Sequence, residues 1–189
     1  MIHETIVTTR ANGHTQIVPL GVRHEGEHIV LAPFRPSKTL DLLLASRCAV
    51  VNYTDDVRIF AGCLTGRYDW PTQHARQVAC ERLTNCLAHT ELLLDAMEDD
   101  GVRPRLLFRP VLSETHAPFT GFNRAQAAVI EAAILVSRLD LLPREKIDSE
   151  MRYLAIAVEK TAGAREREAW QWLCGAIARH HASLEQTRS

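Results

Sequence analysis

The chain has 189 residues, enough to bury a hydrophobic core, and its 22 lysines and arginines nearly balance 23 aspartates and glutamates. No global charge would therefore attract nucleic acid or an anionic membrane surface. The five cysteines form no C-x-x-C pair, no apolar run approaches the roughly 20 residues of a membrane helix, and the N-terminus does not resemble a signal peptide. We expect a cytoplasmic protein that uses no disulfide framework and binds neither nucleic acid nor membrane.

The first third of the chain is typical of β-strands. IHETIVTTR and QIVPLGVR flank Asn12-Gly13, a pair that favours a tight hairpin turn. A second turn at residues 24–27 leads into HIVLAPF, so three antiparallel strands follow one another, as in a meander or barrel. Leucines at helical spacing then predict a short helix capped by Ser37 or Thr39, which ends before Cys48, and CAVVNYT predicts a buried strand.

The rest of the chain changes from strands to helices. VRIFAGCL is ambiguous, and we expect a short helix or an irregular segment there. Residues 79–116 suit a helix by propensity, but the polar turn at 98–101 favours a long hairpin. From residue 123 the apolar spacing predicts three helices, with disorder in the final EQTRS. The first of these helices is apolar over most of its circumference, so we expect the sheet to cover it, with a second subunit as a further candidate.

The junction APFRPSKTL, residues 32–40, has two interpretations. In the structural one, the prolines end a strand, Ser37 caps a helix, and Arg35 and Lys38 are solvated charges. That leaves two cations at the positive end of a helix dipole, where acidic residues would be stabilising. In the functional one, the helix N–H groups, Ser37, Thr39 and Arg35 hold a phosphate. Because neither a P-loop nor a G-x-G-x-x-G is present, the phosphate of a mononucleotide or flavin is favoured over NAD.

Several segments in chain order resemble an uncharacterised family of FMN-binding split-barrel proteins found in archaea and methylotrophic bacteria. They are ETIVTTR, IVPLGV, PFRPSKTLDLL, AVVNYTDD, VEKTAG and above all HAPFTGFNRAQAAVIEAAILVSRL. Split barrels of this kind resemble flavin reductases and pyridoxamine-phosphate oxidases and are usually homodimers with FMN at the subunit interface. The resemblance implies an α+β protein: an FMN-binding split β-barrel over residues 1–120, then a C-terminal helical subdomain over residues 121–189 that packs on the barrel and the dimer partner.

Carried onto this sequence, the resemblance implies an FMN site. The residues around the phosphate would be Arg35, Ser37, Lys38 and Thr39. The flavin ring would lie over two adjacent strands, at Thr8, Thr9, Arg10, Val18, Pro19, Leu20 and Gly21. Asn52 would bind the ring or the ribityl chain, and the second subunit would present Asn123 and Arg124 to the flavin. The structural alternatives stay open: a turn asparagine at 52, a helix cap at 123 and a surface charge at 124.

Two classes of function fit such a protein. In the first it is an FMN-dependent oxidoreductase in which the flavin does the electron chemistry on a small-molecule substrate or electron donor. The family's occurrence in organisms that use methanopterin-type carriers suggests a pterin substrate, by association only. The alternative is a non-catalytic flavin-binding module such as a carrier, sensor or assembly factor. The sequence does not discriminate between them.

The nine histidines never form an H-E-x-x-H or a comparable pair on one helix face, so we expect no metal site. His116 is the one histidine that suits a proton donor beside a flavin, with a structural role in its loop as the alternative. No G-x-S-x-G is present, so nucleophilic catalysis has no support.

Overall fold

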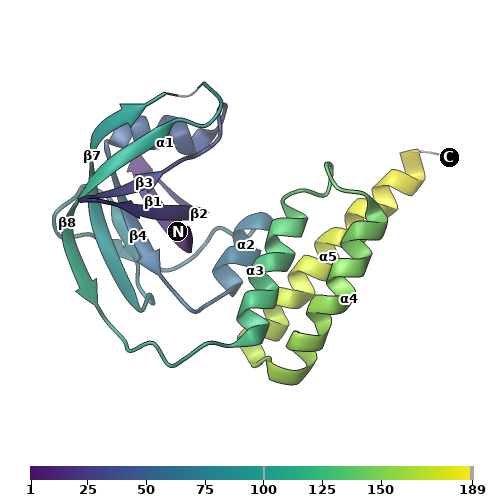
Figure 1. Cartoon of the computed structure of the whole chain (residues 1–189). Helices are drawn as coiled ribbons and strands as arrows, with labels where there is room; N and C mark the ends of the chain where they lie inside the picture. Colours follow the sequence, from purple (N-terminus) through teal and green to yellow (C-terminus); the bar gives the residue numbers. More distant parts are fainter. Residues whose placement is uncertain (100, 188–189) are drawn as a thin grey trace. The chain divides into compact units, whose positions relative to one another are not determined.

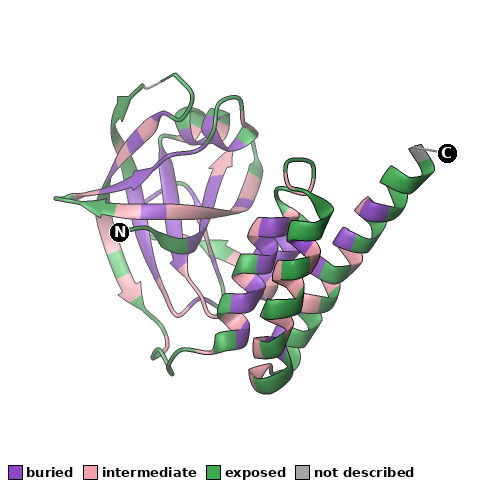
Figure 2. Ribbon diagram, turned by 45° about the vertical axis from the view of Figure 1, so that its right-hand side comes forward, coloured by how far each residue is buried: buried purple, intermediate pink, exposed green. Residues whose placement is uncertain are grey.

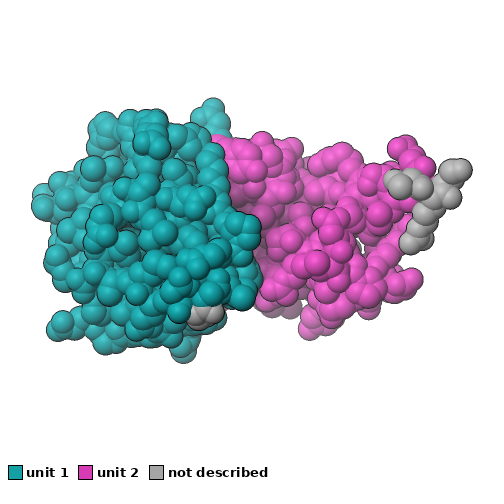
Figure 3. Space-filling view, turned by 90° about the horizontal axis from the view of Figure 1, so that it is seen from above, with its two compact units in different colours: residues 1–54, 69–119 teal, residues 55–68, 120–189 magenta. Residues whose placement is uncertain are grey.

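The computed structural model describes residues 1–99 and 101–187 and separates into two compact units. A barrel unit contains residues 1–54 and 69–119, and a helical unit contains residues 55–68 and the chain from residue 120 onward (Figures 1 and 3). Residues 55–68 therefore join the helical unit, although the sequence analysis placed them within the range of the barrel.

The barrel unit is built on six antiparallel strands that close in the order β1-β2-β3-β8-β7-β4. They are β1 (His3–Ala11), β2 (His14–Glu25), β3 (His28–Leu31), β4 (Cys48–Tyr53), β7 (Ala88–Glu98) and β8 (Arg105–Thr115). A separate two-stranded sheet pairs β5 (Thr72–His74) with β6 (Glu81–Leu83), and α1 (Lys38–Ser46) connects β3 to β4. The predicted fold class, a barrel followed by helices, is confirmed.

The first hairpin follows the predicted turn. Asn12 has φ 53° and Gly13 has φ 76°, and two successive residues at positive φ are what a two-residue hairpin turn with the right-handed strand twist requires. The turn sets the register of β1 against β2, which places His14 opposite Ala11 and Gln16 opposite Thr9. Both β2 residues thereby reach the end of the barrel that carries the start of α1.

Strand β4 is buried on both of its faces (Figure 2). Ala49 and Val51 point into the barrel core, which also contains Phe108. On the outer face, Val50 packs against Val78, which lies in the loop between β5 and β6. This two-sided cover explains the continuous apolar run in CAVVNYT that predicted a buried strand.

Two further predictions of elements in the barrel unit also hold. Helix α1 begins after Ser37, whose hydroxyl accepts a hydrogen bond from the Leu40 N–H at 3.2 Å, and it ends at Ser46, before Cys48. The segment from 79 to 116 contains the long hairpin, β7 paired with β8.

The helical unit consists of α2 (Arg58–Leu64), α3 (Arg124–Val136), α4 (Arg144–Thr161) and α5 (Ala164–Thr187). VRIFAGCL is thus a helix, and its Ala61 packs with Ala132 of α3 and Leu173 of α5 in one core. Helix α4 adds Val158 beside Ala128 of α3. Neighbouring helices of this unit therefore cover α3 on the sides that these residues form.

Helix α5 continues to Thr187, so the expectation of disorder is wrong for residues 185–187, while 188–189 lie outside the described residues. No helix in the described part of the chain combines the length and apolar character needed to cross a bilayer.

Candidate functional site

The start of α1 brings together residues from two distant segments of the barrel unit. Lys38 Nζ lies 3.4 Å from His14 Nε2. Thr39 Oγ1, which is almost fully buried, accepts a hydrogen bond from Gln16 Nε2 at 3.0 Å. Three of the four residues expected around a phosphate, Ser37, Lys38 and Thr39, are consecutive at this helix start, where the first backbone N–H groups have no acceptor within the helix.

Gln16 has a buried amide oxygen without a hydrogen-bond partner among the described residues. A buried acceptor left without a donor costs about 1–3 kcal/mol, so such atoms call for an explanation. The amide nitrogen of the same side chain is bonded to Thr39, which holds the unsatisfied oxygen beside the helix start. A ligand hydroxyl placed here would satisfy it.

Arg35, the fourth residue expected around the phosphate, is already paired. Its Nη1 donates to both carboxylate oxygens of Asp99, at 3.1 and 2.9 Å. The Gly101 N–H and then Arg35 hold the pKa of the exposed Asp99 carboxyl below its usual value, so this carboxylate is charged near neutral pH. An anion at the start of α1 would have to compete with Asp99 for Arg35 or share it.

The residues expected under the flavin ring fall into two groups. The register pairs Thr8, Thr9 and Arg10 with residues 15–17 of β2, whereas Pro19, Leu20 and Gly21 pair with residues 4–6 of β1. The structure therefore places the two groups at different levels of the same hairpin. Only the second group, with Val18 beside it, is partly exposed throughout.

Strand β6 covers the first of these groups. Thr8 Oγ1 donates to the Glu81 carbonyl at 2.5 Å, and Arg10 Nη1 donates to the Glu81 carboxylate at 3.2 Å. Thr9, like Thr8, is fully buried and donates to the Cys48 carbonyl at 3.0 Å. These side chains are engaged in bonds within the barrel unit.

Asn52 is fully buried and uses both ends of its amide inside the chain. Its Nδ2 donates to the Ile6 carbonyl at 3.1 Å, and its Oδ1 accepts from the Leu83 N–H at 2.8 Å. The side chain thus ties β6 and β1 to β4. Asn52 therefore has a structural role, as in the alternative given above, but it lies within strand β4 and not in a turn.

Asn123 and Arg124 lie in the helical unit. Asn123 caps α3 by accepting from the Ala125 N–H at 2.8 Å, and its Nδ2 donates to the Thr161 carbonyl at 3.1 Å. Arg124 follows as the first, exposed residue of the helix. The structural alternative for Asn123, a helix cap, is present in the structure, while the presentation of both residues to a second subunit stays a prediction.

An open cavity of about 430 Å³ lies between the β1–β2 turn and the loop that joins β5 to β6. Its volume is within the roughly 300–1,000 Å³ that is usual for small-molecule sites. Arg10, Asn12 and Gly13 line one side, and residues 74–75 and 78–80 line the other. His14, the next residue after this turn, is the one that contacts Lys38, so the cavity rim and the start of α1 share the hairpin end.

His116 follows β8 and is exposed. Its Nε2 lies 2.8 Å from Nδ1 of the buried His89, and the two rings are nearly parallel, 9° apart. Partial burial lowers the pKa of His116, and the charge of Arg82 lowers it further, so the ring is neutral near neutral pH. A neutral imidazole is a poor proton donor, which weighs against the role that the sequence suggested for it.

Comparisons with family models cover most of the chain. Residues 3–117 match the N-terminal domain of the protein of unknown function DUF447, and residues 123–175 match the second model of the same name. The chain belongs to the DUF447 family. This confirms the resemblance stated above to an uncharacterised family. No curated protein matches the chain.

Among solved structures, this DUF447 chain resembles the FMN-bound protein MM1853 of Methanosarcina mazei, another DUF447 protein. The TM-score is 0.82 at 20% identity, over 93% of this chain and 94% of that one. The FMN-binding protein of Thermus thermophilus has a TM-score of 0.53 at 14% identity, over 59% and 69% of the two chains. Flavin reductase PheA2 has the same score and identity, over 61% and 80%. Likeness at these identities establishes the fold.

Sequence reasoning missed three residues at the candidate site: His14, Gln16 and Asp99. The two-residue turn at Asn12-Gly13 already fixed Gln16 opposite Thr9, so the hairpin register could have indicated one of them. The approach of α1 to β2, and of Arg35 to Asp99, joins segments that are distant in sequence and leaves no local signal.

Proposed function

We propose that this DUF447 protein binds FMN with its phosphate at the start of α1 and acts as an FMN-dependent oxidoreductase on a small molecule. The observation that carries the proposal is the convergence of Lys38 and Thr39 with His14 and Gln16 at a helix N-terminus. The solved DUF447 relative, MM1853, is described as FMN-bound, which supports the choice of ligand.

The residues present fit the phosphate and ribityl parts of FMN. Lys38 supplies a positive charge, the Ser37 hydroxyl a donor, and the first turn of α1 its backbone N–H groups. The unsatisfied Gln16 amide oxygen needs a donor, and a ribityl hydroxyl is one. The start of α1 therefore matches the phosphate of FMN, and Gln16 beside it matches the ribityl chain.

FMN, when bound, supplies the electron and hydride chemistry. The chain's own part is to bind and orient it: the helix start anchors the phosphate, and Pro19, Leu20 and Gly21 offer a partly exposed strand surface for the ring. Thr8, Arg10 and Asn52 support the site indirectly by holding β6 against the barrel. Thr9 instead bonds the first residue of β4, through the Cys48 carbonyl. A pterin substrate stays an association without a structural argument.

We further propose a homodimer in which the second subunit contributes Asn123 and Arg124. Several large apolar side chains are exposed on both units, including Phe34, Phe122 and Tyr153. Exposed aromatic residues are enriched at protein interfaces, so they support an association between copies. None of the described cysteines is in a disulfide, which supports a reducing, cytoplasmic location.

The FMN proposal is tested by titrating the flavin-free protein with FMN and with riboflavin, which lacks the phosphate. FMN should bind more tightly than riboflavin, and Lys38→Ala should weaken FMN about tenfold or more while leaving riboflavin unchanged. Lys146→Ala, an exposed lysine on α4, is the matched control and should change neither. Equal affinity for the two flavins would show that the start of α1 does not bind the phosphate.

The enzyme and the non-catalytic module are separated by anaerobic rapid mixing with NADH, NADPH and reduced deazaflavin. Bound FMN that bleaches faster than FMN in solution indicates an oxidoreductase. Bound flavin that stays oxidised with all three donors favours the carrier, sensor or assembly factor.

A further inference from the structure

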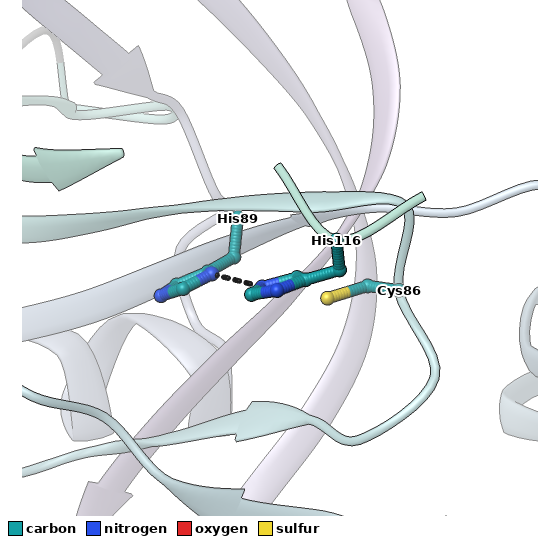
Figure 4. Close-up of side chains that lie close together, drawn as sticks. All are labelled: Cys86, His89 and His116. Atoms are coloured by element: carbon teal, nitrogen blue, oxygen red, sulfur yellow. Dashed lines mark hydrogen bonds between the residues drawn. The ribbon is translucent and has the colours of Figure 1, made fainter. Parts of the chain in front are cut away.

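Three side chains that are suitable metal ligands converge at one end of the β7–β8 hairpin (Figure 4). Cys86 precedes β7, His89 lies near its beginning, and His116 follows the end of β8. The Cys86 sulfur and one nitrogen from each ring all lie within 4.8 Å of one another. Cys86 and His89 are buried, and His116 opens to solvent.

We propose that this cluster binds a divalent transition-metal ion of the zinc type, through Cys86 Sγ, His89 Nδ1 and His116 Nε2. Thiolate and imidazole are the ligands that Zn²⁺ prefers in proteins. Three protein ligands leave a fourth position for water or a small ligand, which is the arrangement of a reactive or exchangeable site. This inference is independent of the proposed flavin site.

Backbone hydrogen bonds connect the segments that carry the three ligands. The His116 N–H donates to the Leu87 carbonyl at 2.7 Å, and the Leu87 N–H donates to the Tyr53 carbonyl at 2.8 Å. His89 pairs across the ladder with Glu114, two residues before His116. Ligands fixed in this way by the scaffold lose little conformational freedom on binding, which favours affinity.

A buried carboxylate orients the central histidine. Glu91 Oε1 lies 3.2 Å from His89 Nε2, and both side chains are fully buried. Because the carboxylate accepts a hydrogen bond, it holds the His89 proton on Nε2 and leaves the Nδ1 lone pair directed at the cluster. A carboxylate behind a histidine ligand is the usual outer contact of a protein metal site.

Glu91 itself is rigidly placed. Its two oxygens accept hydrogen bonds from the backbone N–H groups of Arg76 at 2.7 Å, Gln77 at 2.6 Å and Val78 at 3.1 Å. The cluster is therefore supported from behind by a carboxylate that has no freedom to turn away. A fixed carboxylate behind a histidine is a feature of metal sites, and an accidental cluster of one cysteine and two histidines would not need it.

Metal binding needs a small rearrangement. In the structure, His89 and His116 share a hydrogen bond of 2.8 Å, whereas two nitrogens on one tetrahedral zinc ion lie about 3.3 Å apart. The exposed His116 ring is the one able to shift, with its proton moving to Nδ1. Cys86 loses its proton, so each ion bound releases one proton. Burial raises the pKa of the Cys86 thiol, while Arg82, 4.0 Å from the sulfur, favours the thiolate but repels the ion.

The test uses full-length, untagged protein freed of metal and flavin and titrated with Co²⁺, which reports its ligands by its spectrum. We expect one ion per chain, a thiolate-to-cobalt charge-transfer band, the strong visible absorption of four-coordinate cobalt, and displacement by Zn²⁺. Cys86→Ser should abolish the charge-transfer band, and His116→Gln should lower the affinity at least about tenfold. His24→Gln, an exposed histidine of β2 outside the cluster, is the matched control and should leave the cobalt spectrum and affinity unchanged.

Weak, pale six-coordinate spectra in the wild-type protein would overturn the proposal, since the cluster would then be only a hydrogen-bonded His–His–Glu chain. Binding that persists with the same band and affinity in Cys86→Ser and His116→Gln would also overturn it, because the ion would lie elsewhere. His116 is exposed, so its variant should fold even if the buried Cys86 variant does not. Neither result depends on FMN, whose binding is measured separately.

Discussion

The barrel unit carries two polar clusters that differ in burial. At the start of α1, Arg35 and Lys38 are exposed, and Arg35 bonds another exposed side chain, Asp99. At the end of the β7–β8 hairpin, His89 and Glu91 are fully buried and bond backbone groups and each other. When a hydrogen bond breaks at the start of α1, water can take the place of the lost partner. Water cannot do so at His89 and Glu91, because these side chains are buried.

This difference separates a cluster that can exchange partners from one that supports the fold. Exposed ion pairs contribute about 0–1 kcal/mol, so Arg35 can leave Asp99 for a ligand at small cost. A buried carboxylate without its donors, or buried donors without their carboxylate, costs several times more. We therefore expect changes at the α1 start to alter binding and changes at Glu91 to alter stability.

The largest effect is expected from Glu91→Gln. The new amide group would face N–H donors where a carboxylate oxygen now accepts from Gln77 and Val78. Leaving these buried donors unsatisfied should lower the free energy of unfolding by about 2–4 kcal/mol, measured by urea denaturation. Glu114→Gln, in the neighbouring ion pair with Arg76, is the control and should cost about 1 kcal/mol or less. If both variants lost a similar amount of unfolding free energy, burial would not explain the difference between the two carboxylates.

The same interaction should appear in the pH dependence of stability. Burial by itself raises the pKa of Glu91, but the three backbone N–H groups and His89 outweigh it, so the folded-state pKa is lowered. A lowered pKa stabilises the fold above the unfolded value of about 4.3, and this contribution is lost as the pH falls through the folded value. The gap in unfolding free energy between wild type and Glu91→Gln should therefore narrow below about pH 4. A gap that stays constant down to acid unfolding would contradict the assignment.

Much of the fold could be predicted because its signals are local. The Asn12-Gly13 pair set the first hairpin, the Ser37 hydroxyl set the start of α1, and the run in CAVVNYT set a buried strand. The place of α2 could not be predicted. Its Ala61 packs with Ala132 and Leu173, and no pattern within VRIFAGCL specifies contacts with helices so distant in sequence.

The same contrast holds for the two clusters. Ser37, Lys38 and Thr39 are consecutive, so their chemistry was visible in the sequence before any folding. His89 and His116 are 27 residues apart and meet only because β7 pairs with β8. The spacing of histidines along one helix face gives no signal for a cluster that forms across a strand ladder.

At the exposed cluster, Arg35→Ala tests whether the phosphate attracts the guanidinium away from Asp99. If Arg35 contacts a bound phosphate, its loss should weaken FMN binding by about 1.5–3 kcal/mol, the range for a hydrogen bond to a charged group. Riboflavin affinity should not change, because riboflavin has no phosphate. An equal loss for both flavins, in parallel fluorescence titrations, would mean that Arg35 acts only by holding the junction to Asp99.

The smallest effect, and the sharpest test of this exchange, is expected from Asp99→Asn. Asp99 is exposed and bonds Nη1 of Arg35, so removing its charge weakens its hold on the guanidinium and takes away an anion that competes with the phosphate. FMN affinity should rise about two- to fivefold, and the gain should shrink in high salt, since it comes from exposed charges. The gain should also vanish in the Arg35→Ala background, because Asp99 acts on the ligand through Arg35. If Asp99→Asn tightens FMN equally with and without Arg35, the carboxylate repels the phosphate directly, and Arg35 has no part in binding it.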